Sequence, residues 1–349
     1  MSISLEELQL AARNHGMPLE ALRHEITPLG LHYLLTHYDI PDVDAGEWRL
    51  AVGGRVGREL ELSLDDLRAR QPVTAAITME CAGNGRARLE PHVVSQPWLS
   101  EAIGTAEWTG IPVAELLAEA GPAADALEVV FTGLDRGVEG GVEQLYERSL
   151  SLADAEHGLL AYACNGEPLP PQHGFPLRLI VPGWYGMTSV KWIQRITVVA
   201  EPFEGYQMVT GYRMKRDEDD PGTPITRIEP RSLMLPPGIP DFMTRRRFLR
   251  PGPVRLEGRA WSGWGPVARV EVSTDGGATW VAAELGDPPG PAAWAPWRLE
   301  WDAGEGEHVL CARATDATGR SQPDEPAWNV GGYANNAIQR IPVTVALQS

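Results

Sequence analysis

Basic residues are scarce in this chain. Its 349 residues include 30 Lys and Arg against 47 Asp and Glu, which gives a formal net charge of −17. A general nucleic-acid binder needs a basic face to meet the phosphates, so the charge balance excludes that class. Because 43% of the residues are apolar and 22% are charged, the chain can bury a large core and lacks the composition of a disordered protein.

Cysteines and long apolar stretches are scarce as well. Cys81, Cys164 and Cys311 are odd in number and widely spaced, which excludes a disulfide framework and a CxxC metal site. The uncharged segment 179–190 is shorter than the ~20 residues of a membrane helix and contains Pro182 and two glycines. The first residues are acidic where a secretory signal is basic, so we expect a cytoplasmic protein with no membrane partner.

Glycine and proline are abundant, with 37 and 30 copies, and they favour turns and strands over long helices. Up to about residue 200, short apolar runs predict strands and a few helices, which is typical of an α+β domain. A helix over 112–120 is the clearest, because Pro112 opens it and Gly121 follows it. The other expected elements are a partial helix over 5–12 and strands over 47–53, 126–131 and 176–181.

The last hundred residues show a different pattern. Segment 202–253 is rich in Pro, Arg and acids and predicts an irregular connection. Beyond it, residues alternate with a period of two, and Asp275, Gly276 and Gly277 form a hairpin signal. We therefore expect an α+β fold with a mixed catalytic domain over 1–245 and an immunoglobulin-like β-sandwich over 246–349. The expected sandwich strands are 254–261, 268–273, 308–314 and 341–347.

The segment 78–86 (TMECAGNGR) carries the most chemical information. An apolar run ends in Cys81, and small, turn-forming residues follow at once, which places the thiol at a strand end beside a sharp loop. One interpretation is a buried, inert cysteine. The other is a thiolate that binds a soft metal or attacks a substrate, helped by backbone N–H groups and by Arg86. Composition alone leaves both open.

The sequence ECAGNGR resembles the cysteine loop of the sulfite oxidase family of molybdenum enzymes. The resemblance continues over 131–135, 159–170, 173–183 and 189–192, and the tail with WSGWGPVARVEVSTDGGATW resembles the family's dimerisation domain. It therefore implies a sulfite-oxidase-type molybdopterin domain followed by a β-sandwich dimerisation domain, and a homodimer. In that family the loop cysteine is the sulfur ligand of molybdenum, so the implied cofactor is molybdenum–molybdopterin with Cys81 as the metal ligand.

The resemblance also implies roles for single residues. Arg and Lys suit the cofactor's phosphate, while carboxylates and imidazoles can pair with its pterin. Tyr212 matches the family's active-site tyrosine, with Tyr206 as a rival, and Cys164 and Cys311 match no ligand. The implied cofactor-binding residues are His37, Cys81, Asp135, His173, Arg178, Ser189 and Lys191, and the implied catalytic residues are Cys81, Arg86, Trp98 and Tyr212. Without the resemblance, His173 and Arg178 are more typical of surface or interface residues, and core packing accounts for Trp98 about as well as a pocket role does.

The sequence departs from the family in its substrate pocket, where three arginines are expected. Arg86 is kept, but Leu35 and Gly331 stand in the two other places. Each charge-assisted hydrogen bond to an anion contributes about 1.5–3 kcal/mol, so losing two weakens sulfite binding by about two to four orders of magnitude. Arg213, or one of the arginines at 245–247, would have to reach the pocket to compensate.

Three functional hypotheses follow. The first is a molybdenum-dependent oxidoreductase that transfers oxygen to sulfite or a related small substrate. With no CxxCH haem motif in the sequence, its electrons would pass to an external acceptor such as a cytochrome, and the net charge of −17 favours a basic one. The second keeps the cofactor but takes a less anionic sulfur or nitrogen substrate, as an oxidase or a reductase. The third is a non-catalytic binding protein on the same scaffold.

Overall fold

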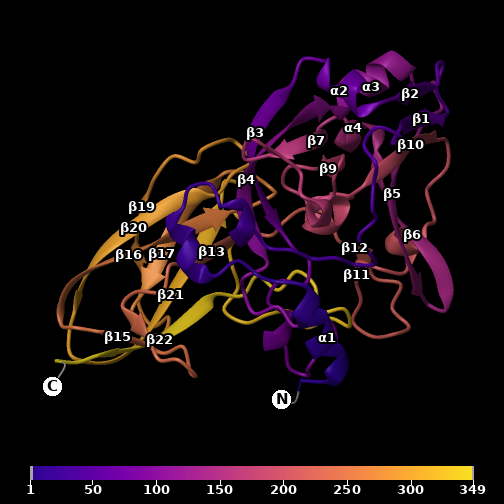
Figure 1. Cartoon of the computed structure of the whole chain (residues 1–349). Coiled ribbons are helices and arrows are strands. Elements are labelled where there is room, and N and C mark those ends of the chain that lie inside the picture. Colours follow the sequence, from indigo (N-terminus) through magenta and orange to yellow (C-terminus); the bar gives the residue numbers. More distant parts are fainter. Residues whose placement is uncertain (1–2, 348–349) are drawn as a thin grey trace.

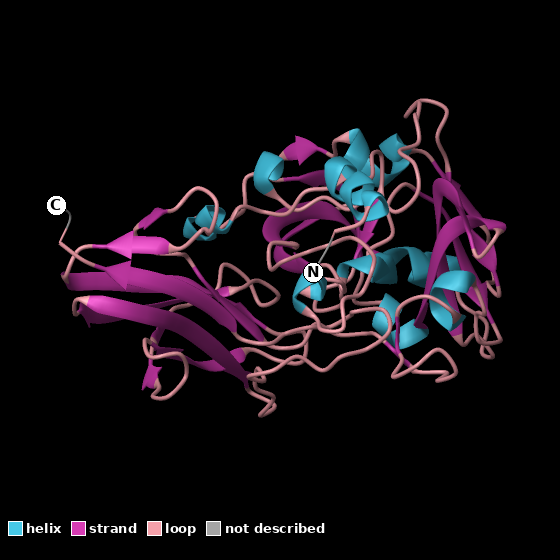
Figure 2. Ribbon diagram, turned by 90° about the horizontal axis from the view of Figure 1, so that it is seen from below, coloured by secondary structure: helices cyan, strands magenta, loops and turns pink. Residues whose placement is uncertain are grey.

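The computed structural model describes residues 3–347, which form two domains lying side by side (Figure 1). The first domain mixes strands with short helices, and the second is built almost wholly from strands (Figure 2). This arrangement confirms the predicted α+β class with a β-sandwich at the C-terminal end.

The first domain contains two sheets of five strands each. One has the order β2-β1-β10-β5-β6, in which β1 and β10 run parallel and the other neighbours run antiparallel. Its strands are β1 Leu50–Gly54, β2 Leu60–Leu62, β5 Glu128–Glu139, β6 Val142–Ser151 and β10 Ile193–Val199. The second sheet is antiparallel and has the order β3-β4-β7-β8, with β9 also paired to β7. Its strands are β3 Val73–Glu80, β4 Ile103–Pro112, β7 Leu159–Cys164, β8 Glu167–Pro168 and β9 Arg178–Ile180.

Five short α-helices accompany these sheets, and their ends follow from local sequence. The predicted helix begins directly after Pro112 and ends at Gly121, which adopts the left-handed conformation with φ 66°. In the N-terminal helix, the Ser4 hydroxyl accepts from Glu7 N while the Glu7 carboxylate accepts from Ser4 N, a capping box. The helices are α1 Leu5–Arg13, α2 Leu64–Arg68, α3 Val113–Ala120, α4 Leu152–Ala155 and α5 Tyr206–Val209.

The second domain is a sandwich of a four-stranded and a six-stranded sheet. The first has the order β13-β16-β20-β19, with strands β13 Arg231–Met234, β16 Gly252–Trp261, β19 Glu284–Leu285 and β20 Ala295–Ala303. The second has the order β14-β15-β22-β21-β17-β18, with strands β14 Ile239–Pro240, β15 Arg247–Leu249, β17 Val267–Ser273, β18 Val281–Ala282, β21 Gly306–Asp316 and β22 Gln339–Val345. Gly276 and Gly277 both take positive φ in the predicted hairpin turn.

The connection between the domains is largely irregular, as predicted, and holds the short pair β11 Arg213–Met214 and β12 Thr223–Pro224. The division expected between residues 245 and 246 stays a prediction. Strands β13 and β14, which precede it, already pair with strands of the sandwich. Across residues 3–347, every helix is too short or too polar to cross a membrane.

Among residues 3–347, apolar side chains form three buried clusters: one in the first domain, one in the sandwich, and one that extends from the first domain to Leu233, Trp261 and Trp294 of the second. Cys81, Trp98 and Cys164 belong to the cluster around β3, β4 and β7, and Cys311 is fully buried in the sandwich. Cys164 and Cys311 therefore pack as predicted. Cys81 differs from them because its strand, β3, ends at the wall of a cavity.

Candidate active site

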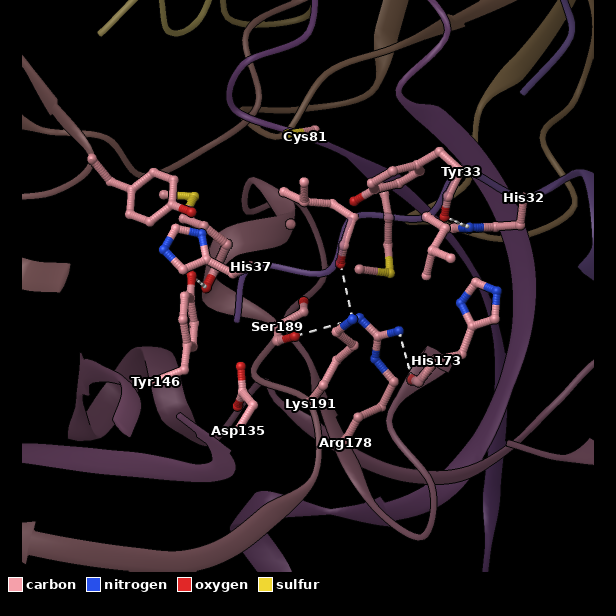
Figure 3. Close-up of a pocket in the computed structure, with 16 residues that line it drawn as sticks. His32, Tyr33, His37, Cys81, Asp135, Tyr146, His173, Arg178, Ser189 and Lys191 are labelled. Carbon is pink, nitrogen blue, oxygen red and sulfur yellow. Dashed lines mark hydrogen bonds between the residues drawn. The ribbon is translucent and has the colours of Figure 1, made fainter. Parts of the chain in front are cut away.

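A cavity with an empty volume of about 660 Å³, its open mouth included, lies in the first domain. The segments that meet there are far apart in the chain: the loop 32–37, the end of β3, strands β5 and β6, and the loops before β9 and β10. Figure 3 shows Cys81 on one side and Arg178, Ser189 and Lys191 on the other. The predicted site residues that line the cavity are His37, Cys81, Asp135, His173, Arg178, Ser189, Lys191 and Tyr212.

The Cys81 loop is held from behind by a buried carboxylate. Glu80, 1% exposed, accepts from Asn84 Nδ2 at 2.9 Å and from Trp261 Nε1 at 2.8 Å. Its Oε1 also lies 2.8 Å from Nε of Arg231, which is itself buried, so the two form an ion pair. The loop turns at Gly85, whose φ of 90° and close approach to Asn335 favour glycine.

The Cys81 thiol is buried but lies among groups that favour a thiolate. Burial raises the pKa of Cys81, while the Arg86 guanidinium, the Gly83 N–H and the Trp98 indole lower it. A metal ion bound to the sulfur would displace the proton outright. Arg86 and Trp98 themselves do not line the cavity. Both are buried and lie close enough to Cys81 to lower its pKa.

Two cations, the buried Arg178 and the half-buried Lys191, lie across the cavity from Cys81. Arg178 donates to the backbone carbonyls of His173 at 3.0 Å and Ser189 at 3.4 Å, and Lys191 Nζ donates to those of Leu35 at 2.9 Å and Gln172 at 3.0 Å. Burial lowers the pKa of Arg178 to about 10 and also lowers the pKa of Lys191. Because Arg178 is buried, Lys191 is half-buried and both have carbonyls as their hydrogen-bond partners, this side of the cavity favours an anion.

Neutral imidazoles accompany these cations. Burial lowers the pKa of His32 to about 4, and burial with the charges of His32 and Arg178 lowers that of His173 to about 2. Burial raises the pKa of Asp135, an effect that the nearby Lys191 opposes. His37 lies at the other end, where its Nε2 is 3.2 Å from Glu139 Oε2.

The donors and acceptors on the cavity wall fit a phosphorylated pterin. Within residues 3–347, His32 Nε2, Asp135 Oδ1 and Arg178 Nε are buried without a hydrogen-bond partner, so a ligand with both donors and acceptors would satisfy them. Residues 3–347 contain no group of three His, Cys, Asp or Glu side chains that could hold a metal ion without further ligands. A metal beside Cys81 would therefore take further ligands from the cofactor.

Tyr212 and Tyr206, the two candidates for the active-site tyrosine, occupy different places. Tyr212 is 8% exposed, lines the cavity and has a positive φ of 51°, which is uncommon for a residue with a side chain. Its ring centroid lies 6.4 Å from that of His37 and 5.4 Å from that of Tyr333. Tyr206 begins α5 outside the cavity lining.

The arginines considered as replacements for the two missing ones point elsewhere. Arg213 donates to the carbonyls of Pro221 and Gly222. Arg245 and Arg247 pair with Glu20, and Arg246 pairs with Glu307. Leu35 lines the cavity in the place where the resemblance implies an arginine.

Sequence reasoning missed several residues at this site, of which Arg148 carries charge. It is 3% exposed, lies on the same face of β6 as the cavity-lining Tyr146, and holds its guanidinium 5.6 Å from the Tyr212 ring centroid. Its Nη1 donates to the Gln207 carbonyl and its Nε has no partner among the described residues. The period-two alternation of segment 142–151 was the available signal. The other missed residues are His32, Tyr33, Tyr146 and Tyr333.

Comparison with known proteins gives the same cofactor. Residues 37–207 match the family described as "Oxidoreductase molybdopterin binding domain", and residues 226–346 match "Mo-co oxidoreductase dimerisation domain". The chain is 38% identical to sulfite oxidase from Gallus gallus, an alignment that covers 94% of this chain and 75% of that protein. It is 37% identical to mitochondrial sulfite oxidase from Macaca fascicularis, over 92% of this chain and 62% of that one.

The names of two further relatives state other activities. The nitrate reductase [NAD(P)H] of Hordeum vulgare is 33% identical, over 92% of this chain and 39% of its own. The solved structure of the sulfane dehydrogenase SoxCD from Paracoccus pantotrophus matches with a TM-score of 0.81 and 28% identity, covering 95% of this chain and 86% of that one. The chain thus spans 62% of the macaque protein and 39% of the barley protein. It belongs to the sulfite oxidase-like family of molybdopterin oxidoreductases, whose cofactor is molybdenum bound by molybdopterin.

Proposed function

We propose that this chain transfers an oxygen atom to sulfite or a related small sulfur compound and passes the electrons to an external acceptor. The observation that carries the proposal is the cavity itself. Cys81 lies on one side, the cations Arg178 and Lys191 lie on the other, and Tyr212 also lines the cavity. The residues implied for the metal, the substrate and the phosphate thus converge on one space.

The cavity residues divide the work of holding the cofactor. Arg178 and Lys191 would meet the phosphate, Ser189 would support that end, and His173, His37 and Asp135 would pair with the pterin. Cys81 would place its sulfur on the metal. When bound, the molybdenum cofactor supplies a transferable oxygen and accepts two electrons.

The remaining residues act on the substrate or on Cys81. The Tyr212 side chain lines the cavity with Cys81, and its hydroxyl would donate a hydrogen bond to a substrate oxygen. Burial raises the pKa of Tyr212 well above its usual value, so the phenol stays a donor at neutral pH. Arg86 and Trp98 lie outside the cavity lining and would act through Cys81, because both lower the pKa of its thiol and so favour the thiolate that binds a metal.

Sulfite-dependent reduction of the metal centre tests the proposal. Protein shown by elemental analysis to contain molybdenum should change its absorbance when sulfite is added, and Cys81→Ser should lose this change. Cys164→Ser, which removes another buried cysteine, is the matched control. Loaded protein that sulfite and other small sulfur compounds leave unreduced would contradict the proposal. Failure to load molybdenum in a competent host would favour the non-catalytic alternative.

A second candidate is the same cofactor acting on a less anionic sulfur or nitrogen compound, as an oxidase or a reductase. The observation that favours it is Leu35, an apolar side chain in the cavity lining where the resemblance implies an arginine. Dye-linked reduction assays with neutral sulfoxides and with nitrate would distinguish this direction from sulfur oxidation.

The second domain supports a proposed homodimer, since residues 226–346 match a dimerisation domain. Light scattering of the purified protein should give twice the chain mass of 38.1 kDa. A monomer at micromolar concentration would contradict this part of the proposal. A cytochrome remains the acceptor that we propose.

A further inference from the structure

Tyr333 occupies the space next to Gly331. A Cβ built on Gly331 would lie 2.1 Å from Cε2 and 2.5 Å from Cδ2 of the Tyr333 ring, far inside van der Waals contact. The backbone of Tyr333 is fixed by Asn329, whose Oδ1 accepts from Tyr333 N at 2.9 Å and whose Nδ2 donates to Tyr333 O at 2.8 Å. Any side chain at position 331, an arginine included, would clash with the Tyr333 ring. Gly331 and Tyr333 therefore depend on each other.

Tyr333 also contacts Arg86, the one of the three expected pocket arginines that the sequence keeps. The Arg86 guanidinium stacks over the Tyr333 ring at 5.0 Å, and its Nε donates to the Gly331 carbonyl at 2.8 Å. The Tyr333 ring also contacts the Tyr212 ring, and the Arg148 guanidinium contacts the Tyr212 ring in turn. Two guanidinium groups thus flank a pair of tyrosine rings, and neither group belongs to the cavity lining.

The surface that faces a substrate near Cys81 is consequently apolar and aromatic. Leu35, which packs against the apolar cluster that contains Cys81, and Tyr212 both line the cavity. Within residues 3–347, the Arg and Lys side chains of the lining are Arg178 and Lys191, across the cavity (Figure 3). Doubly charged sulfite, with three oxygens, needs several cationic donors in contact with it. A singly charged group with an apolar substituent needs fewer.

We propose that Tyr333 and Leu35 determine specificity and select an organic sulfinate, R–SO2−, over sulfite. The inference rests on the proposed function. The sulfur of a sulfinate keeps a lone pair, its two oxygens can accept from Tyr212, and its substituent R packs against Leu35 and the tyrosine rings. In the balanced reaction, R–SO2− and water give R–SO3−, two protons and two electrons. A sulfur–oxygen bond forms, both O–H bonds of water break, and the electrons pass to an external one-electron acceptor.

Steady-state kinetics with methanesulfinate and sulfite test the selection, because a methyl group here replaces one sulfite oxygen. With molybdenum-loaded protein and ferricyanide, we expect kcat/KM for methanesulfinate to exceed that for sulfite at least tenfold. Leu35→Arg should shift the ratio at least tenfold toward sulfite. Val281→Arg adds the same charge on an exposed strand of the sandwich and should leave the ratio unchanged.

A second readout needs neither cofactor nor turnover. In cofactor-free protein, Gly331→Ala should lower Tm by several degrees because its Cβ meets the ring, and Gly331→Arg should lower it further. Tyr333→Val in the same chain should recover most of the loss. If the Tm change of the double variant equals the sum of the Tm changes of the two single variants, Tyr333 does not fill this space. That result would overturn the coupling.

The kinetic outcomes separate the two proposals. Reduction by sulfite but not by methanesulfinate would overturn the sulfinate inference and leave the proposed function intact. If loaded protein responds to neither compound, the sulfinate inference fails; if other small sulfur compounds also leave it unreduced, the proposed function fails with it. If Leu35→Arg and Tyr333→Val leave the ratio of the two kcat/KM values unchanged, these residues do not determine specificity. This holds even if methanesulfinate is oxidised.

Discussion

Arg148 illustrates how a single residue can serve the site at a cost to the fold. Burial lowers the pKa of Arg148, and its neighbours include tyrosine rings and the Gln207 carbonyl. Replacing a buried charge with an apolar side chain of similar size is often neutral or stabilising. We expect Arg148→Met to keep or raise Tm while raising KM for an anionic sulfur substrate up to about tenfold, ~1.4 kcal/mol, because Arg148 positions the Tyr212 ring that lines the cavity.

Thermal unfolding and steady-state kinetics on the same preparation check this prediction. Arg136→Met is the matched control, because Arg136 is exposed and pairs with the equally exposed Glu143. A fall in Tm of many degrees with KM unchanged would assign Arg148 to the fold and not to the site.

Residue identities could be predicted where a motif fixes them. Cys81, Arg178 and Lys191 stand in segments whose resemblance to a family is specific, and the structure brings them to one cavity. Arg148 and Tyr333 could not be found that way. Their importance depends on packing against Tyr212, and contacts between residues so far apart in the chain leave no local pattern.

At the scale of elements, the Cys81 loop depends on the second domain. The buried ion pair joins Glu80, the last residue of β3, to Arg231, the first residue of β13. Removing one partner of such a pair leaves a buried charge, so Arg231→Met should lower the free energy of unfolding by about 3–5 kcal/mol. Glu80→Gln combined with Arg231→Met should recover part of that loss.

Urea denaturation of the single and double variants measures the pair. Arg255→Met, which breaks an exposed pair with Glu300, should cost about 1 kcal/mol or less. An equally small effect of Arg231→Met would mean that the domains do not share this energy. Molybdenum content of the same variants reports whether the loop still positions Cys81.

Element ends were predictable where capping residues mark them, as in α3 between Pro112 and Gly121. The regular alternation of β16 and β21 likewise predicts strands without further knowledge. The short strands β13 and β14 were not predicted. They lie in a Pro-rich connection and exist because neighbouring strands of the sandwich offer them partners.

At the scale of the whole molecule, pH tests the buried imidazoles. His32 and His173 have folded-state pKa values of about 4 and about 2, below the usual 6.5. Above pH 6.5 both are neutral in either state. As the pH falls below 6.5 the unfolded chain binds protons that the folded protein does not, so stability is lost at about 1.4 kcal/mol per pH unit for each imidazole.

Urea unfolding of cofactor-free protein between pH 7 and pH 5 measures this loss. His32→Gln should flatten the decline, whereas substitution of the exposed His157 should not. Equal slopes for the two variants would contradict the assignment.

The net charge of −17 gives a second expectation for the whole molecule. If it steers a basic cytochrome toward the protein, the rate of cytochrome reduction should fall several-fold between about 20 and 200 mM salt. Reduction of an anionic acceptor such as ferricyanide should not slow in the same way. If the rate of cytochrome reduction does not change with salt, the net charge does not steer the partner and instead serves solubility.

The hydrogen bond from Arg86 to the Gly331 carbonyl also constrains how the protein is made. The wall beside Cys81 is closed by residues some 250 positions further along the chain. A ribosome must therefore release nearly the whole polypeptide before this wall can form. Cofactor insertion into a finished pocket is thus a step that follows synthesis.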